Sequence, residues 1–243
     1  MGEDVTEIFS SIQGEGKYLG CRQIFLRLAG CNLSCMYCDA ASQASPFCRV
    51  EHESGSHEFE LMKNPLSTDE VLSVIRELNK RTVHQALSLT GGEPLLHTEF
   101  IGAIAPGLRE QNLPLLLETN GTLPDRLAQV MDEVAIVSMD IKLPSMTGKD
   151  YWEEHRRFIS LAKDKDLYVK IIVTQETGEE EFRQAVEIAA IAPESMLVLQ
   201  PVTPTGNVRP ISPQRILALQ SYAARHHADV RVMPQAHKMM GQL

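Results

Sequence analysis

Short apolar runs with β-type composition alternate with amphipathic segments along the whole chain, and this alternation limits the fold more than any other feature. The predicted strands are residues 24–28, 86–90, 114–118, 134–139, 167–174, 196–200 and 230–233. The predicted helices are residues 71–80, 99–110, 124–131, 149–162, 179–190 and 213–226. Strands that alternate with helices indicate an α/β protein with a parallel sheet. A partial or complete (β/α) barrel and an open doubly wound sheet both fit this pattern.

Local sequence signals indicate where one helix begins and where the alternation of strands and helices is interrupted. Ser67-Thr68-Asp69-Glu70 is a capping box, which predicts a helix start just before the apolar face that begins at Val71. Residues 40–65 lack clear periodicity and are rich in Ser, His and Glu, so they are predicted to be an extended loop or a small insertion. No internal repeat or shift in composition divides the chain, and residues 1–243 are expected to form a single domain.

Composition and charge exclude several classes of partner. The net charge is −9, which argues against a nucleic-acid backbone as a ligand, because phosphate binding needs a basic face. No apolar run approaches the length of a membrane span, and residues 1–10 lack the layout of a signal peptide. The chain is therefore expected to be cytoplasmic.

Three of the five cysteines crowd into eight residues, in Cys31-Asn32-Leu33-Ser34-Cys35-Met36-Tyr37-Cys38. In a reducing cytosol, clustered cysteines indicate metal or redox chemistry. Three thiolates on one loop could hold three corners of a [4Fe–4S] cluster and leave the fourth iron open. Structural zinc wants four ligands, and Cys21, Cys48, His52 or His57 could complete such a set, so the spacing alone leaves both metals open.

A second motif follows the next predicted strand, in Thr90-Gly91-Gly92-Glu93-Pro94. The two glycines allow close approach of the backbone to a ligand, and Glu93 could accept a hydrogen bond from an ammonium group. Together with the cysteine spacing and aromatic Tyr37, this motif resembles the radical S-adenosylmethionine (SAM) superfamily. The resemblance implies a cluster held by Cys31, Cys35 and Cys38, with SAM on the open iron. An electron from the reduced cluster then cleaves SAM to a radical that abstracts hydrogen from substrate.

Further segments narrow the resemblance to one family. The segments are residues 9–16, 25–33, 118–122, 140–145, 199–202 and 233–238, which span nearly the whole chain. They closely resemble 7-carboxy-7-deazaguanine synthase, which converts 6-carboxy-tetrahydropterin to the deazapurine precursor of queuosine-type nucleosides. The family has a reduced radical SAM core, so the resemblance implies a partial (β/α) barrel with its site at the carboxyl ends of the strands.

The resemblance also implies roles for individual residues. The segment that binds the pterin ring in the family is matched by Ile12, Gln13, Gly14 and Glu15. Arg27 matches the residue that pairs with the substrate carboxylate, a task suited to a bidentate guanidinium. Thr90 and His237 are expected to contact the substrate. The residues expected to contact SAM are Tyr37, Cys38, Asp39, Gly92, Glu93, Asp140, Lys142 and Gln200. Cys21 and Cys48 have no matching role, and we expect a buried thiol and a loop thiol, respectively.

Asp140 lies where the family often has Ser, and a second departure from the family pattern bears on a metal ion. Family members commonly carry Thr or Ser two residues beyond the third cysteine, where the hydroxyl helps to bind Mg²⁺. This chain has Ala40 there, and a methyl group cannot ligate a hard cation. Either Ser42 supplies the oxygen, or water replaces it, or the protein works without Mg²⁺.

The remaining expectations concern partners and rival functions. The resemblance implies a homodimer, a small carboxypterin substrate and a reductant protein such as flavodoxin. One rival is a radical SAM activase that installs a glycyl radical on a partner protein. Another is a non-catalytic zinc or iron–sulfur protein.

Overall fold

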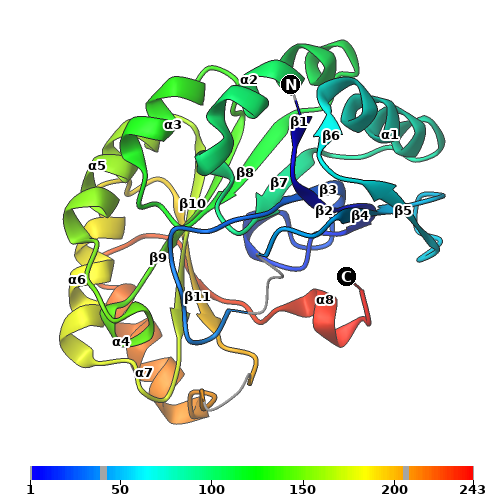
Figure 1. Cartoon of the computed structure of the whole chain (residues 1–243). Helices are drawn as coiled ribbons and strands as arrows, with labels where there is room; N and C mark the ends of the chain where they lie inside the picture. Colours follow the sequence, from blue (N-terminus) through cyan, green and yellow to red (C-terminus); the bar gives the residue numbers. More distant parts are fainter. Residues whose placement is uncertain (1, 39–42, 205–207, 243) are drawn as a thin grey trace.

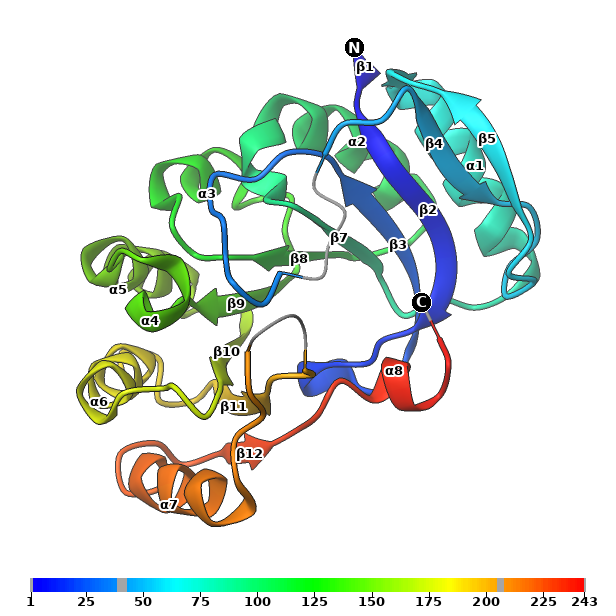
Figure 2. The ribbon, with the colours of Figure 1, turned by 60° about the horizontal axis from the view of Figure 1, so that its bottom comes forward.

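The computed structural model describes residues 2–38, 43–204 and 208–242. Its main sheet is drawn in Figures 1 and 2, and it has the strand order β12-β11-β10-β9-β8-β7-β3-β2-β4-β5. The strands of this sheet are β2 Val5–Ile12, β3 Arg22–Leu28, β4 Phe47–Glu51, β5 Phe59–Lys63, β7 Leu87–Gly91, β8 Leu115–Thr119, β9 Ile136–Ile141, β10 Asp166–Val173, β11 Met196–Pro201 and β12 Val230–Val232. A separate antiparallel pair joins β1 Gly2–Glu3 to β6 Leu66–Ser67.

Strands β3 and β7 to β12 pair in parallel with their neighbours and follow the order of the chain. A doubly wound sheet reverses its strand order at a switch point, and this described run has no reversal. Successive right-handed crossovers in one direction place the helices on one face. The sheet therefore curls with its helices outside, as Figures 1 and 2 show. The predicted partial barrel is confirmed, and the doubly wound alternative is wrong.

The outer layer consists of α1 Thr68–Arg81, α2 Thr98–Glu110, α3 Pro124–Val130, α4 Pro144–Thr147, α5 Trp152–Ala162, α6 Glu179–Ala189 and α7 Pro213–Ala223. The predicted capping box is present at α1, where Glu70 N donates to Ser67 Oγ and Ser67 N donates to Glu70 Oε2. Helix α5 begins at Trp152 instead of the predicted Lys149, because Gly148 ends α4 in the left-handed conformation just before it.

The edge formed by β2, β4 and β5 was not predicted. Strand β2 runs antiparallel to β3, and β4 and β5 form an antiparallel pair within the segment expected to be a loop or small insertion. Strand β2 buries residues on both faces, including Thr6, Ser10 and Ser11, so it lacks the alternation that marks a strand. Cys48 is fully buried on β4, whereas Cys21 is half-buried, which reverses the expected environments of these two thiols.

Apolar side chains fill the amino-terminal end of the barrel interior. Leu116, Ile136, Tyr168 and Met196, each near the start of its strand, pack into one cluster. The short 3-10 helix η1 Gly16–Tyr18 lies against it, and a Cβ on Gly16 would come within 2.1 Å of the Tyr168 ring. This packing closes the interior at one end and leaves the carboxyl ends of the strands open for a site.

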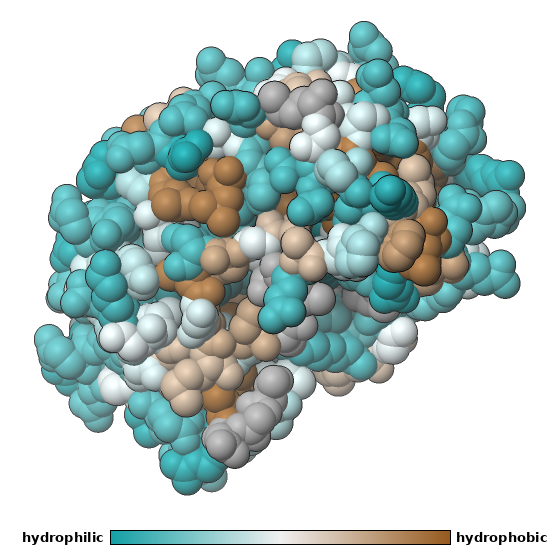
Figure 3. All heavy atoms as spheres, in the orientation of Figure 1, coloured by the Kyte–Doolittle hydropathy of each residue, from teal (hydrophilic) through white to brown (hydrophobic). Residues whose placement is uncertain are grey.

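The face of the molecule seen in Figure 3 is mainly polar. Figure 3 shows hydrophilic side chains over most of one face, with apolar residues in small separate patches. Among the described residues, no helix is long and apolar enough to cross a membrane.

Candidate active site

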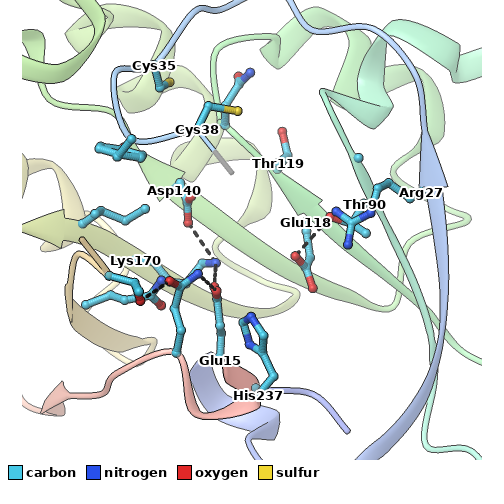
Figure 4. A pocket seen from close by; sticks show the side chains of 18 of the residues that line it. Glu15, Arg27, Cys35, Cys38, Thr90, Glu118, Thr119, Asp140, Lys170 and His237 are labelled. Atoms are coloured by element: carbon cyan, nitrogen blue, oxygen red, sulfur yellow. Dashed lines mark hydrogen bonds and ion pairs between the residues drawn. The ribbon is translucent and has the colours of Figure 1, made fainter. Parts of the chain in front are cut away.

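One cavity of about 500 Å³ lies at the carboxyl ends of the parallel strands. Beyond the apolar layer, each strand from β7 to β11 contributes a polar residue to its lining, namely Thr90, Glu118, Asp140, Lys170 and Gln200. The volume falls within the usual range of small-molecule sites. Figure 4 shows Cys35 and Cys38 on one side of this cavity, Glu15 and His237 on another, and Asp140 between them.

The three clustered cysteines all line the cavity from the loop that follows β3. All five cysteines lie in the described ranges, and none forms a disulfide. Burial raises the pKa of the Cys31 and Cys35 thiols. Backbone contacts hold the loop, because Leu33 N donates to Cys31 Sγ over 3.4 Å and Met36 N donates to Met146 O over 3.0 Å.

A ring of three side chains ties the cysteine loop to the end of β8. Asn32 Nδ2 donates to Thr122 Oγ1, Thr122 Oγ1 donates to Asn120 Oδ1, and Asn120 Nδ2 donates back to Asn32 Oδ1, over 2.8, 2.6 and 2.9 Å. Since Asn32 directly follows Cys31, this ring holds the first cysteine in register with the strand ends.

Glu93 lies behind the cavity wall and supports the same region. It is fully buried, Thr119 Oγ1 donates to its Oε1 over 2.8 Å, and Asn120 N donates to its Oε2 over 2.8 Å. Burial raises the pKa of this carboxyl group, although hydrogen bonds from Asn120 and Leu95 oppose the rise. Glu93 is not among the residues that line the cavity, and its carboxylate positions Thr119 and Asn120, both of which do line it.

Glycine is required on the cavity side of this motif. A Cβ on Gly92 would lie 1.8 Å from the carbonyl oxygen of Gly30, and one on Gly91 would lie 2.1 Å from that of Leu28. Gly91 also has a φ of 136°, which side-chain-bearing residues rarely adopt. The two glycines therefore let the backbone pass close to the start of the cysteine loop, with Gly92 on the cavity surface.

The loop after β2 and the C-terminal segment close another side of the cavity. Ala236 N donates to Gly14 O over 2.9 Å, at the start of helix α8 Ala236–Met239. A Cβ on Gly14 would lie 2.1 Å from His237 Nδ1, so only glycine allows this approach. Gln13 Nε2 donates to Glu118 Oε1 over 3.0 Å, which fixes the loop to β8.

Four alternating charges cross the cavity, and we call Glu15, Lys170, Asp140 and Lys142 the charge chain. Lys170 Nζ lies 2.7 Å from Glu15 Oε2 and 3.2 Å from Asp140 Oδ1, and Lys142 Nζ lies 2.8 Å from Asp140 Oδ2. Burial alone would raise the pKa of Glu15, but the charge and hydrogen bond of Lys170 lower it to about 2. The pKa of Asp140 is likewise lowered, against the effect of burial, by Lys142 and Lys170.

Arg27 reaches the cavity from β3, and Glu7 holds it. Arg27 Nε lies 3.2 Å from Glu7 Oε2, while Arg49 Nη1 lies 2.6 Å from the other oxygen of Glu7. The register pairs Arg27 with Thr90 on β7, so the guanidinium and the hydroxyl lie on neighbouring strands of the same wall. In Figure 4 both side chains lie beside Glu118.

The cavity unites most of the residues singled out from the sequence. It is lined by Ile12, Gln13, Gly14, Glu15, Arg27, Cys31, Cys35, Tyr37, Cys38, Thr90, Gly92, Asp140, Lys142, Gln200 and His237. Glu93 is the exception among the described ones, and Asp39, Ala40 and Ser42 lie outside the described residues.

Sequence reasoning missed other residues that line the same cavity. The clearest of them are Glu7, Glu118, Lys170 and Gln235. Lys170 carried a usable signal, since a lysine in the middle of an otherwise apolar strand must find a partner when buried. Glu118 and Gln235 lie in segments that resemble the family, whereas Glu7 had no such signal, because its position depends on the curl of the sheet.

The described side chains fit the cofactors of a radical SAM site. Across residues 2–38, 43–204 and 208–242, no three His, Cys, Asp or Glu side chains are arranged to hold one metal ion. Three thiols that line one cavity suit a [4Fe–4S] cluster, in which each cysteine binds a different iron. Gln200 Oε1 is buried and accepts no hydrogen bond from a described residue, so it can accept one from a ligand.

Comparisons with known proteins agree with this geometry. The sequence profile of the Radical SAM superfamily matches residues 26–189. The 7-carboxy-7-deazaguanine synthase of Geobacter sulfurreducens is 43% identical and aligns with 100% of this chain and 98% of its own length. That of Methanocaldococcus jannaschii is 34% identical, with coverage of 98% and 100%. The crystal structure of QueE from Escherichia coli has a TM-score of 0.64 at 21% identity, covering 98% of this chain and 95% of its own, which shows a shared fold.

The fold and the cysteine-lined cavity define a radical SAM enzyme, a class that carries a [4Fe–4S] cluster and uses SAM. Within that class, full-length similarity at 43% identity shows that the chain belongs to the 7-carboxy-7-deazaguanine synthase family. Its enzyme class is therefore that of a radical SAM lyase, and the rival hypothesis of a non-catalytic zinc or iron–sulfur protein is wrong.

Proposed function

We propose that this enzyme converts 6-carboxy-5,6,7,8-tetrahydropterin to 7-carboxy-7-deazaguanine by ring contraction with loss of ammonia. The observation that carries the proposal is that one cavity is lined both by the three thiols and by the residues expected to bind the pterin. A radical formed at the cluster side would therefore meet a substrate held only a few side chains away. The product belongs to the biosynthesis of queuosine-type deazapurines.

On the cofactor side, Cys31, Cys35 and Cys38 would hold the cluster. When bound and reduced, the cluster and SAM supply the radical that abstracts hydrogen from the substrate. Buried Gln200 has an acceptor available for the adenine, and Tyr37, Gly92, Asp140 and Lys142 surround the remaining space. The same proposed contact set includes Cys38, Asp39 and Glu93.

On the substrate side, the proposal assigns Gln13, Gly14 and Glu15 to the pterin ring. A planar heterocycle with several N–H and carbonyl groups is recognised by amide, carboxylate and backbone groups at its edge. Arg27 would pair with the substrate carboxylate, because Glu7 engages its Nε and leaves the two terminal nitrogens for a bidentate contact. Ile12, Thr90 and His237 complete this wall.

Several further features belong to the same proposal. The chain works as a single domain, forms a homodimer and acts in the cytoplasm, and a flavodoxin-like protein reduces the cluster. With Ala40 at the usual hydroxyl position, Mg²⁺ has at most an auxiliary role, and water takes the place of the hydroxyl ligand.

The test is anaerobic incubation of the reconstituted enzyme with SAM, a reductant and 6-carboxy-tetrahydropterin. We expect a deazapurine chromophore and one ammonia released for each product formed. SAM cleavage that continues without consumption of the carboxypterin would contradict the proposed substrate. Hydrogen abstraction from a protein partner instead would favour the glycyl-radical activase.

A further inference from the structure

We propose that Lys170 is a positioning residue that couples binding of the carboxypterin to binding of SAM. The inference rests on the proposed function, because it assigns Glu15 to the pterin side and Asp140 to the SAM side. Lys170 Nζ lies between these carboxylates, 2.7 Å from Glu15 Oε2 and 3.2 Å from Asp140 Oδ1, as Figure 4 shows. One cation thus serves two subsites.

The two carboxylates have separate second partners. Gln235 Nε2 donates to Glu15 Oε1 over 2.8 Å, and Lys142 Nζ donates to Asp140 Oδ2 over 2.8 Å. Each carboxylate therefore has one oxygen held on its own side of the cavity and one oxygen directed to Lys170. The ammonium is the single direct link between the two sides in the charge chain.

The link joins groups on adjacent strands and is poorly screened. The side chain of Lys170 is 6% exposed, and strand register sets Lys170 beside Asp140 on adjacent strands β10 and β9. Charges that are shielded from water interact more strongly than surface charges. When a ligand neutralises part of the charge of one carboxylate, the strength of the ion pair between Lys170 and the other carboxylate therefore changes as well.

The direction of the coupling follows from competition for this ammonium. N–H groups of a pterin that contact Glu15 satisfy part of its negative charge, so Lys170 is drawn less to Glu15 and more to Asp140. The looser of the two contacts to Asp140, the 3.2 Å approach of Lys170 to its Oδ1, then tightens before SAM arrives, and less conformational freedom is lost when SAM binds. Substrate should tighten SAM binding, and by linkage SAM should tighten substrate binding by the same factor.

The experiment measures SAM affinity with and without 6-carboxy-tetrahydropterin by calorimetry, on reconstituted enzyme kept oxidised so that SAM stays intact. The unmodified enzyme should bind SAM about tenfold more tightly with substrate present, within the usual range of coupling between sites. In Lys170→Met this ratio should fall to within about twofold of unity, whereas Lys170→Arg, which keeps the cation, should retain most of it.

Lys17→Met is the matched control, because Lys17 Nζ also forms a short ion pair, 2.6 Å from Asp166 Oδ1, but lies outside the cavity lining. Its coupling ratio should match that of the unmodified enzyme. If Lys170→Met does not fold, Lys170→Gln keeps hydrogen-bond donors without the charge and should show the same loss.

Two results overturn the inference: an unmodified enzyme whose two ligands bind independently, or a folded Lys170→Met or Lys170→Gln variant that keeps the tenfold ratio. The proposed function is overturned by a different result, namely that the carboxypterin does not bind the unmodified enzyme at all, with or without SAM.

Discussion

Asn120 donates a hydrogen bond from its side-chain Nδ2 to Oδ1 of Asn32 over 2.9 Å, across 88 residues of sequence. This bond joins the loop of the three cysteines to the end of β8, and the buried carboxylate of Glu93 fixes the backbone of Asn120 from behind. The placement of the thiols thus depends on the strand ends as well as on the spacing of the cysteines.

Removal of the Asn32 side chain should loosen the cysteine loop. Asn32→Ala deletes two of the three hydrogen bonds in the ring, each worth about 1 kcal/mol. We expect several-fold faster loss of iron from the reconstituted enzyme on exposure to a chelator, with a broadened electron paramagnetic resonance signal of the reduced cluster. Ser34→Ala, at an exposed position of the same loop, is the control and should keep both properties.

The assignment of the cluster ligands is tested by replacing each cysteine in turn. Cys31→Ala, Cys35→Ala and Cys38→Ala should each abolish both the cluster and SAM cleavage, because a site with one open iron has no spare ligand. Cys21 and Cys48 lie outside the cavity lining, so their Ala variants should retain full iron content. Iron loss in either of these two would show that the ligands are misassigned.

Arg27→Ala should weaken substrate use while leaving uncoupled SAM cleavage largely intact. Loss of a buried charge-assisted pair costs roughly 2–5 kcal/mol, so turnover should fall at least thirtyfold. Arg27→Lys should recover only part of the loss, because an ammonium cannot form the bidentate fork. The measurement compares deazapurine formation with 5′-deoxyadenosine formation, and normal turnover in the Ala variant would exclude this pocket.

Stability should fall with acidification, in part through His84. Burial, followed by the charge of Arg22 on β3, lowers the pKa of His84 from 6.5 to about 4, while Glu51 on β4 opposes this shift. Between these values the unfolded chain binds a proton that the folded chain does not, so folding free energy is lost as the pH falls through this window.

The measurement is anaerobic urea unfolding followed by the fluorescence of Trp152, the single tryptophan. Between about pH 7.5 and pH 5, His84→Gln should lose less stability than the unmodified protein, by up to about 2 kcal/mol. His226→Gln, at an exposed position, should show the full loss. Equal pH slopes for the unmodified protein and His84→Gln would mean that His84 is already protonated in the folded state.

Mg²⁺ should stimulate this enzyme only weakly, because Ala40 lacks the hydroxyl that family members commonly offer. Ala40→Thr should strengthen the dependence by restoring one oxygen ligand. The measurement is a Mg²⁺ titration of both proteins after treatment with a chelator that spares the cluster. A steep, tightly saturating requirement in the unmodified enzyme would point to another ligand, with Ser42 the first to test.

The sequence by itself determined most of the alternating strands and helices of the barrel and showed that the cysteine loop binds a metal or a cluster. Periodic apolar residues report which face of a helix is buried, as at α1, where Val71, Ile75 and Leu78 enter the core. Three cysteines within eight residues are close together in any fold, so their spacing alone carries information about metal binding. Strand β2 was not predicted for a related reason. It is buried on both faces, so its sequence lacks the alternation of apolar and polar residues by which a strand is recognised.

Only the tertiary structure decided which distant side chains meet in the cavity. Glu15 and Lys170 are 155 residues apart, and Glu15 and Gln235 are 220 apart, yet all three are hydrogen-bonded together. Their contacts depend on strand register, on the curl of the sheet and on the closing loops, none of which is a local property of the chain. The same holds for Glu93, whose motif is visible in the sequence but whose buried carboxylate accepts hydrogen bonds from Thr119 Oγ1 and Asn120 N, which no local pattern indicates.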